Sequence, residues 1–328
     1  MSKTLISSPL QGFTDFRFRN ALHEIFGGID TYYAPYIRLN GKLDIKSSYR
    51  RDLDPANNRV PELIPQVMTA SAEEFLFVTK YVQSLGYKEL NWNLGCPYPM
   101  ACKKGMGSGL IQDSEKIDAI LYRVHSETDI TVSMKMRMGY YEPTEILDVF
   151  PVLAKYPIKN IAIHARLGKQ LYKGAVDLES FENCLKHTQQ TVYYNGDITS
   201  VAVFREMEKR FPSINHFMMG RGLIADPFLP SMIKANSTVF PEDSVQKLYE
   251  FHNRLFDEYD VFLQGLSHLM SKMHNFWEYY AIGFNNPKKV YKKIKKAKNV
   301  IQYKIAVKEI MQEEEAFRLS LVPPNSRE

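Results

Sequence analysis

The stretch NWNLGCPYPMACKKGMGSGL, residues 91–110, is the part of the chain around which the other predicted elements can be arranged. Residues Glu89–Leu94 form a short apolar run that predicts a β-strand, and this run ends at Gly95, directly before Cys96 and Pro97. This stretch contains four glycines, which can adopt backbone conformations and make close contacts that a side chain would block. They are Gly95, Gly105, Gly107 and Gly109. We therefore expect a rigid, open loop that presents Cys96 at the end of a strand.

A single cysteine is more often a buried packing residue than a reactive group. Cys96, however, follows a strand end and lies between a glycine and a proline, which favours a functional role. Together with Cys102 and Cys184 it makes an odd number of cysteines, and their spacing matches neither a disulfide framework nor a paired-cysteine metal site. We expect no metal site.

The composition is that of a globular protein, with 45% hydrophobic and 24% charged residues in a chain of 328. This length can hold one large domain and one small domain. The sequence lacks an apolar run of the roughly 20 residues that a membrane-spanning helix needs, and its first residues do not resemble a signal peptide. We expect a cytoplasmic monomer without a membrane partner.

The net charge of +5 is unevenly distributed. Seven lysines and no acidic residue lie between Lys288 and Lys298, so the rest of the chain is slightly acidic overall. This pattern predicts contact with a polyanion that is confined to the C-terminal region.

Apolar runs alternate with helical patterns along the first two thirds of the chain, which is typical of a parallel α/β fold. The predicted strands are residues 4–8, 31–37, 63–68, 89–94, 131–136, 160–164, 191–195 and 216–219. The predicted helices between them are residues 15–26, 72–85, 114–127, 144–156, 178–187 and 199–210. Eight strands match a (β/α)8 TIM barrel, although an open, doubly wound sheet would show the same alternation.

The polar residues near the strand ends favour the barrel. They are Pro9, Gln66, Asn93, Lys135, His164, Asn195 and Arg221. In a TIM barrel these ends meet at one face, where active sites lie and where the loops after strands seven and eight often bind phosphate. Here those loops read YYNGDITS and MMGRGLIADP, and their glycines, with Arg221 and the N-terminus of the following helix, could hold a phosphorylated ligand.

The alternation stops near Pro241, and apolar residues then recur at helical spacing. We expect a barrel domain over residues 1–240 and a small all-helical domain over residues 241–328. The tail, residues 323–328, gives little reason to expect order.

Several motifs, in this order, resemble those of the tRNA-dihydrouridine synthases, which are flavin-dependent enzymes that reduce uridine in tRNA. They are SPLQGFTDFRFR, NLGCP, GMGSGL, MKMRMG, IHAR, YNGDI and MMGRGLI, followed by the helical segment KMHNFWEYYAIGFNNPKKVYKKIKKAKN. The resemblance covers about residues 4 to 316. Leu10 replaces a common methionine and Leu167 a frequent threonine of the family, so the subfamily stays open.

The resemblance implies an FMN-binding TIM barrel, a helical tRNA-binding domain, and NADPH or NADH as the electron donor. It implies that Cys96 is the catalytic proton donor and that Asn93 lies beside both flavin and uracil. The residues expected to bind the cofactor are Pro9, Leu10, Gln66, Asn93, Lys135, His164, Asn195, Gly196, Asp197, Gly220 and Arg221. Of these, Gln66, Lys135 and His164 would contact the flavin ring or ribityl chain. Its phosphate would be held by Asn195, Gly196, Gly220 and Arg221.

The proposed chemistry suits a thiol. The carbon 5–carbon 6 double bond of uracil is conjugated to a carbonyl, so hydride adds at carbon 6 and a proton must then reach carbon 5. Thiols, with an unperturbed pKa of about 8.5, are mostly protonated at neutral pH and acidic enough to donate to such a centre. The target uridine must leave its stacked environment to reach a barrel mouth.

The residues expected to bind the substrate are Asn93, Arg137, Arg166, Tyr172, Lys288, Lys292, Lys295 and Lys296. Lys135 could also be a solvated strand-end residue, and His164 a core histidine. A buried lysine, however, needs an anionic partner, such as a reduced flavin. The lysine run could be a solvated helix face; its lack of acidic residues favours RNA phosphates. We expect Trp277, just before this run, to belong to the core.

Two other functions remain open from the residues alone. One is another FMN-dependent barrel oxidoreductase that acts on a small conjugated substrate, which leaves the basic helical domain without a role. The other is a non-catalytic RNA-binding protein. A dinucleotide-binding open sheet is disfavoured because no strand leads into a G-x-G-x-x-G helix.

Overall fold

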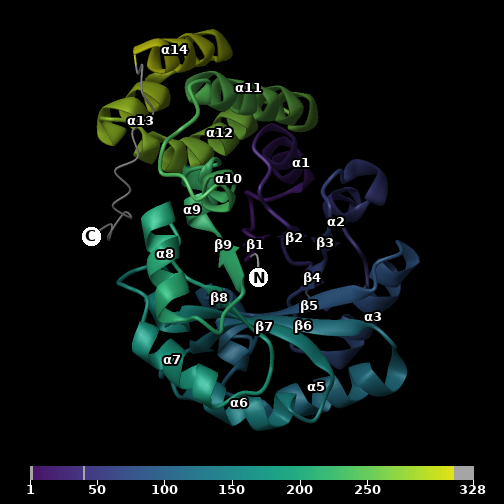
Figure 1. Cartoon of the computed structure of the whole chain (residues 1–328). Coiled ribbons are helices and arrows are strands. Elements are labelled where there is room, and N and C mark those ends of the chain that lie inside the picture. The colour runs from purple at the N-terminus through teal and green to yellow at the C-terminus, as the bar shows by residue number, and fades with distance from the viewer. Residues whose placement is uncertain (1–2, 40, 314–328) are drawn as a thin grey trace.

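The computed structural model describes residues 3–39 and 41–313. Within this part of the chain, parallel strands form one sheet in the order β3-β2-β1-β9-β8-β7-β6-β5-β4. The strands are β1 (Thr4–Ser7), β2 (Thr31–Tyr33), β3 (Leu63–Ile64), β4 (Gln66–Val67), β5 (Glu89–Leu94), β6 (Thr131–Gly139), β7 (Ile158–Leu167), β8 (Val192–Asn195) and β9 (His216–Met219). The strands lie at the centre of the barrel in Figure 1.

Pro65 explains why the sheet has nine strands and not the expected eight. It separates β3 from β4 because proline has no N–H group to donate to a neighbouring strand. β3 pairs with β2, whereas β4 pairs with β5 and is bridged to Ile37, so both ends of the strand order meet in one interrupted strand. The sheet therefore closes on itself, which confirms the TIM barrel and excludes the open sheet.

The predicted ends of four strands were wrong. The strand expected at residues 63–68 is split, and the one expected at residues 31–37 ends at Tyr33. In contrast, β6 continues to Gly139 and β7 to Leu167, because the two strands pair from Val132–Ile158 to Gly139–Leu167 and bury their residues against each other. Lys135 and His164 consequently lie inside strands, and Arg221 begins a helix.

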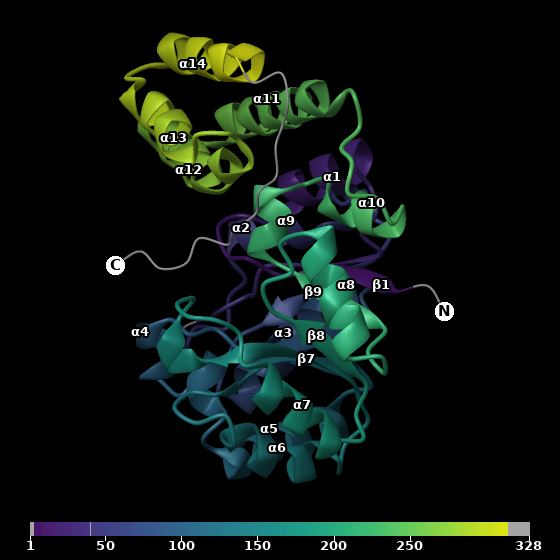
Figure 2. The ribbon, with the colours of Figure 1, turned by 60° about the vertical axis from the view of Figure 1, so that its left-hand side comes forward.

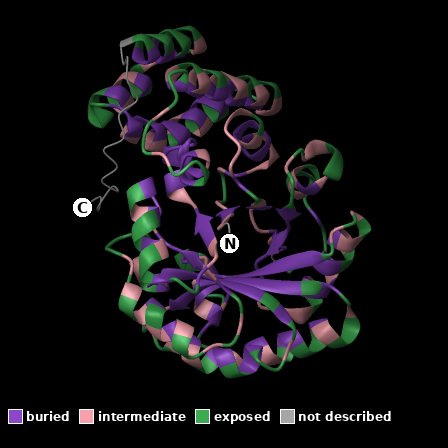
Figure 3. Ribbon diagram, in the orientation of Figure 1, coloured by how far each residue is buried: buried purple, intermediate pink, exposed green. Residues whose placement is uncertain are grey.

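Helices cover the outside of the barrel, and polar residues fix where several of them begin. Asp15, Ser71, Asp113, Asp177 and Ser200 each accept a backbone hydrogen bond from the first turn of the helix that follows. These helices are α1 (Phe16–Ile25), α3 (Ala72–Ser84), α5 (Ser114–Glu127), α7 (Leu178–Lys186) and α8 (Val201–Arg210). Figure 3 shows their exposed outer faces around a buried sheet.

The remaining barrel helices are short or uncapped. They are α2 (Ser47–Leu53), α4 (Pro99–Cys102), α6 (Glu145–Leu153), α9 (Arg221–Ala225) and α10 (Leu229–Lys234), with 3-10 turns η1 (Pro55–Asn57), η2 (Gly107–Leu110) and η3 (Gly168–Gln170).

Up to Glu313, where the described part of the chain ends, four helices follow the barrel, namely α11 (Ser244–Phe262), α12 (Leu266–Tyr280), α13 (Pro287–Lys296) and α14 (Val300–Glu313), with η4 (Ala281–Gly283) after α12. Figures 1 and 2 show them grouped beside α1, α9 and α10. The helical C-terminal region is thus present, and α11 begins just after the predicted boundary. The predicted tail, residues 323–328, lies outside the described residues.

The helical region and the barrel share one hydrophobic core. The ring of Phe18 on α1 lies 5.7 Å from Phe251 on α11 and 5.8 Å from Phe276 on α12. The hydroxyl of Tyr259 donates a 2.7 Å hydrogen bond to Asp15 at the start of α1. Trp277 is fully buried, as predicted. Among the described residues, no helix is both long and apolar enough to cross a membrane.

Candidate active site

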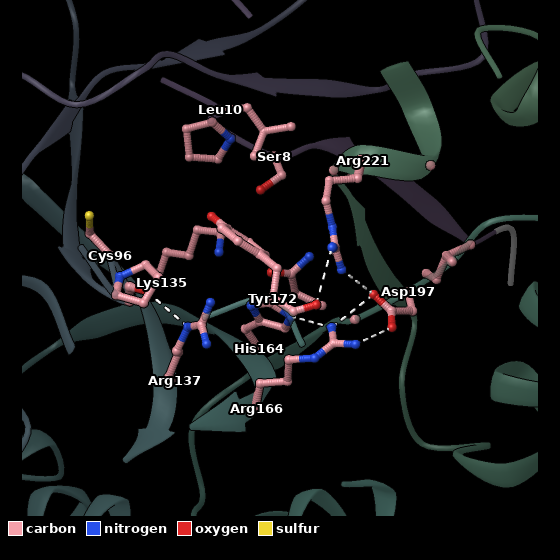
Figure 4. A pocket seen from close by; sticks show the side chains of 18 of the residues that line it. Ser8, Leu10, Cys96, Lys135, Arg137, His164, Arg166, Tyr172, Asp197 and Arg221 are labelled. Carbon is pink, nitrogen blue, oxygen red and sulfur yellow. Dashed lines mark hydrogen bonds and ion pairs between the residues drawn. The ribbon is translucent and has the colours of Figure 1, made fainter. Parts of the chain in front are cut away.

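A cavity of about 1250 Å³, part of it open solvent, lies where the carboxyl ends of the strands meet. Its lining comes from every barrel strand but β3 and β4, or from the loops that follow them, and also from Tyr279 and Ile282 of the helical region. Figure 4 shows Cys96 at one end and Asp197 with Arg221 at the other, with Lys135, His164 and Tyr172 between them. The cavity is therefore elongated and has two chemically different ends.

Backbone contacts fix the loop that carries Cys96. The side-chain oxygen of Asn93 accepts hydrogen bonds from the N–H groups of Gly95 and Cys96, at 3.0 and 2.9 Å. The carbonyl oxygen of Cys96 accepts from Ser108, and a Cβ atom on Gly107 would lie only 2.5 Å from this oxygen. Gly107 also has a φ of +58°, which favours glycine. Hydrogen bonds and close backbone packing thus hold the loop that presents Cys96 at the end of β5.

Gln66 lies beneath the cavity and does not line it. Its side chain is fully buried, donates a 2.7 Å hydrogen bond to Asn91 and accepts one of 2.7 Å from Asn93. Asn91 in turn donates to the hydroxyl of Ser133 on β6. The structure thus places Gln66 where it supports Asn93.

Buried cationic groups occupy the middle of the cavity. Burial, together with the nearby charge of Arg137, lowers the pKa of Lys135 to about 7. Burial also lowers the pKa of Arg137, to about 10, and its guanidinium donates to the carbonyl oxygens of Gly95 and Leu167. Arg137, expected to bind the substrate, here joins the Cys96 loop to the end of β7.

His164 is neutral. Burial, and then the charges of Arg137 and Lys135, hold its pKa well below the usual range. Its Nε2 lies 3.3 Å from Arg166, which can only donate a hydrogen bond, so Nε2 accepts and Nδ1 carries the proton. His164 can therefore offer one donor to a bound molecule.

Arg166, Asp197 and Arg221 form an ion-pair cluster at the far end of the cavity. Arg166 pairs with both oxygens of Asp197, and Arg221 lies 2.8 Å from one of them. Burial raises the pKa of Asp197, but the hydrogen bonds and charges of the two arginines outweigh burial and lower it. Arg166, predicted to bind the substrate, and Asp197, predicted to bind the cofactor, thus hold each other and orient Arg221.

Beside this cluster, the loops after β8 and β9 form a glycine-rich cradle. Asn195, Gly196 and Gly220 line it, and a Cβ atom on Gly220 would lie 3.6 Å from Cβ of Ser8 and 3.7 Å from the side chain of Leu10. Gly222 packs so closely that its Cβ atom would lie 2.1 Å from the carbonyl oxygen of Ile198. Glycine at position 222 therefore allows the two loops to approach each other closely.

Thr199 also lines this cradle, and sequence reasoning did not single it out. Its hydroxyl oxygen is buried and has no hydrogen-bond partner among the described residues. A buried polar atom without a partner is costly unless a ligand satisfies it. Thr199 and the backbone around it therefore fit a phosphorylated cofactor. The only sequence signal was its position four residues after Asn195.

Tyr172 projects into the cavity from the loop after β7. Its ring centre lies 5.3 Å from the guanidinium of Arg137 and 4.8 Å from that of Arg221. Leu171 before it has a φ of +54°, which is unusual for leucine, and Lys173 after it is exposed. Pro9 and Leu10 line the opposite wall, and Tyr36 reaches Cys96 without having been predicted.

The four predicted lysines of α13 lie away from the cavity. Lys288, Lys292, Lys295 and Lys296 are exposed, whereas Val290 and Ile294 of the same helix are buried. α13 thus presents a basic face to solvent. Within the described ranges, no cluster of three or more His, Cys, Asp or Glu side chains could hold a metal ion.

Residues 5–322 match the family described as Dihydrouridine synthase (Dus). A probable tRNA-dihydrouridine synthase of Staphylococcus epidermidis is 26% identical over 264 residues, which is 78% of each chain. The tRNA-dihydrouridine synthase B of Pseudomonas putida is 26% identical over 234 residues, or 70% of this chain and 67% of that one.

Solved structures share the fold at low identity. A complex of 2-naphthoyl-CoA reductase with 2-naphthoyl-CoA has a TM-score of 0.55 and 12% identity, and the match covers 71% of this chain and half of that one. A morphinone reductase mutant in complex with tetrahydroNAD has a TM-score of 0.51 and 8% identity, over 74% and 90% of the two chains.

Proposed function

The chain belongs to the dihydrouridine synthase family, and from this premise we propose that the protein reduces specific uridines in tRNA to dihydrouridine with bound FMN and NADPH or NADH. The observation that carries the proposal is the elongated cavity, which joins a fixed thiol at one end to a glycine-rich, arginine-bearing cradle at the other. A long, planar cofactor with a terminal phosphate would match this arrangement, with its phosphate in the cradle and its planar ring toward the thiol.

The residues present fit FMN. Its phosphate would lie against Gly196, Thr199 and Gly220, with Arg221 supplying a positive charge. Lys135, His164 and Asn93 would lie along the flavin ring and ribityl chain, and Pro9 and Leu10 would cover its other side. When bound, the flavin supplies the hydride that carbon 6 of uracil accepts.

Lys135 adds an electrostatic reason for this assignment. Burial lowers the pKa of its ammonium group to about 7. An anionic group in the cavity would restore the charged form, since a nearby negative charge favours ammonium. Lys135 thus favours a cofactor that becomes more negative when it is reduced.

Cys96 would deliver the proton. The Asn93 side chain and Ser108 hold the backbone of the loop, which presents the thiol at the cavity edge. The sulfur gives its proton to carbon 5 and keeps the electron pair of the broken S–H bond.

The helical region would bind the tRNA. We propose that Lys288, Lys292, Lys295 and Lys296 contact backbone phosphates, while the extruded uridine enters the cavity near Tyr172, Tyr279 and Cys96. In this proposal, residues 1–240 form the catalytic domain and residues 241–328 the tRNA-binding domain, and the protein acts as a monomer.

The test begins with the absorbance spectrum of the purified protein. Anaerobic NADPH should bleach a bound flavin, and unmodified tRNA should then reoxidise it with dihydrouridine in the product. A flavin that reoxidises with a small enone but not with tRNA would favour the small-substrate oxidoreductase instead. Absence of flavin would overturn the cofactor assignment.

A further inference from the structure

Tyr36 lies beside Cys96 although the two residues come from different parts of the barrel. Its hydroxyl oxygen is 3.7 Å from Sγ of Cys96, a hydrogen-bond distance for sulfur, and both residues line the same cavity. Both also pack against a small apolar cluster formed by Met68, Ala101 and Met106. The contact is therefore built into the site and does not depend on an exposed loop.

We propose that the Tyr36 hydroxyl donates a hydrogen bond to the sulfur of Cys96 and stabilises the thiolate that remains after the thiol has given up its proton. The catalytic part of this inference rests on the proposed function, whereas the hydrogen bond itself does not. Tyr36 would then be a catalytic residue that acts on the reacting sulfur.

The direction of the hydrogen bond follows from chemistry. Burial, and then the neighbouring sulfur, raise the pKa of Tyr36 above its usual value, so the phenol keeps its proton throughout the working pH range. A thiolate has no proton to donate, which leaves Tyr36 as the donor. Before the reaction, a phenol that donates to the sulfur also leaves the S–H group free to point into the cavity.

The proposed step is balanced. The S–H bond breaks, the electron pair that develops at carbon 5 of uracil takes the proton, and the sulfur retains its own electron pair as a thiolate. Solvent returns a proton to the sulfur before the next turnover. Tyr36 keeps its proton throughout and contributes only a charge-assisted hydrogen bond.

Other charged and titratable groups face this pair. Lys135 and Arg137 approach Cys96 from β6, and Arg38 and Tyr49 approach Tyr36 from the segment after β2 and from α2. These groups also influence the thiolate, so the test must change only the Tyr36 hydroxyl. Tyr36→Phe does this, because the ring that packs against Met68 and Met106 is retained.

The first experiment measures the rate of iodoacetamide alkylation of Cys96 against pH in the full-length holoprotein. A Cys102→Ser, Cys184→Ser background removes the other thiols. Loss of a hydrogen bond to a charged group should move the pH midpoint of alkylation upward by about one unit in Tyr36→Phe. Tyr98→Phe is the matched control, since Tyr98 is exposed on the same loop. Superimposable profiles for Tyr36→Phe and its parent would overturn the proposal.

The second experiment measures single turnovers with reduced flavin. Tyr36→Phe should slow reoxidation by tRNA about tenfold, in line with a hydrogen bond to a charged group. Reduction of the flavin by NADPH should be unchanged. Unchanged reoxidation would overturn the catalytic role, even with a shifted alkylation profile. If the parent protein does not reduce tRNA, the proposed function fails, and the alkylation shift alone still decides the hydrogen bond.

Discussion

At the scale of single residues, Cys96 can be removed without disturbing the turn that carries it. Asn93, Gly107 and Ser108 contact the backbone of this turn and not the sulfur. Cys96→Ala should therefore retain bound flavin and tRNA affinity but lose about 10²- to 10⁴-fold in the rate of uridine reduction, the usual contribution of a positioned proton donor. Single-turnover reoxidation of reduced flavin by tRNA measures the loss.

The matched control is Cys102→Ala, whose sulfur donates to the carbonyl oxygen of Cys96 and lies 3.5 Å from the hydroxyl of Ser108. It should keep most of the activity. Full activity of Cys96→Ala would rule out the assignment of the proton donor.

The lowered pKa of Lys135 predicts that the stability of the flavin-free protein depends on pH. Its folded-state pKa of about 7 is below the usual lysine value of about 10.4. Between these values the unfolded chain holds a proton that the folded chain has lost, so this residue makes stability rise as pH increases above 7. Below pH 7 both states are charged, and the full cost of burying the ammonium group remains.

Lys135→Met should remove this component, which amounts to at most about 1.4 kcal/mol per pH unit between pH 7 and 10. Urea unfolding at several pH values tests this, because the unfolding free energy of Lys135→Met should rise less steeply with pH than that of the parent. Lys209→Met, at an exposed position on α8, should leave the slope as it is. Equal slopes for Lys135→Met and the parent would show that folding does not lower the pKa of Lys135.

Sequence reasoning brought Cys96, Asn93, Lys135 and His164 to one cavity because each lies near the end of a predicted strand. It did not predict Tyr36, since Cys96, the residue that Tyr36 contacts, is 60 positions away in the sequence. Gln66 shows the opposite error. Its position near a strand end predicted that it lines the cavity, but its amide group forms hydrogen bonds with Asn91 and Asn93. Such partners depend on strand register, which a single sequence does not contain.

At the scale of elements, helix starts were easier to predict than strand ends. Capping residues such as Ser71 and Asp113 act on the turn that follows them, so the signal is local. The length of a strand depends on its neighbours, and β6 and β7 extend each other beyond what either apolar run suggested. Pro65 was visible in the sequence, yet only the pairing of β3 with β2 and β4 with β5 shows that it divides one strand.

Tyr303 should be the main polar attachment of α14. Its buried hydroxyl accepts a 2.9 Å hydrogen bond from Trp277 on α12 and lies 2.7 Å from His252 on α11. Tyr303→Phe leaves both partners buried and unsatisfied, so we expect a loss of about 2 to 3 kcal/mol in unfolding free energy. Urea denaturation measures this loss.

Tyr122→Phe provides the comparison, because Tyr122 is 68% exposed and should change stability by less than about 0.5 kcal/mol. If the two variants are equally stable, the hydrogen bonds of Tyr303 contribute nothing to the attachment of α14.

At the scale of the whole molecule, the basic face of α13 predicts salt-dependent tRNA binding. Replacing Lys288, Lys292, Lys295 and Lys296 with glutamine should lower tRNA affinity and reduce the slope of log affinity against log salt by about one for each lost phosphate contact. Filter binding at several salt concentrations measures this slope. The helix should stay folded, since Val290 and Ile294 are unchanged.

A control variant with Lys80→Gln and Lys116→Gln, on α3 and α5 of the outer barrel, should keep the parent slope. An unchanged slope in the α13 variant would show that the RNA binds to another surface of the protein. Reduction of the flavin by NADPH should be the same in all three proteins, because neither set of lysines lines the cavity.

The core that Phe18 shares with Phe251 and Phe276 has a consequence for how a substrate is selected. Buried aromatic packing and the Asp15–Tyr259 hydrogen bond join α1 to α11. The described structure therefore sets one distance and one direction from the α13 lysines to Cys96. For an RNA that binds as we propose, this spacing would act as a molecular ruler: the phosphates that dock on α13 would determine which nucleotide reaches the thiol.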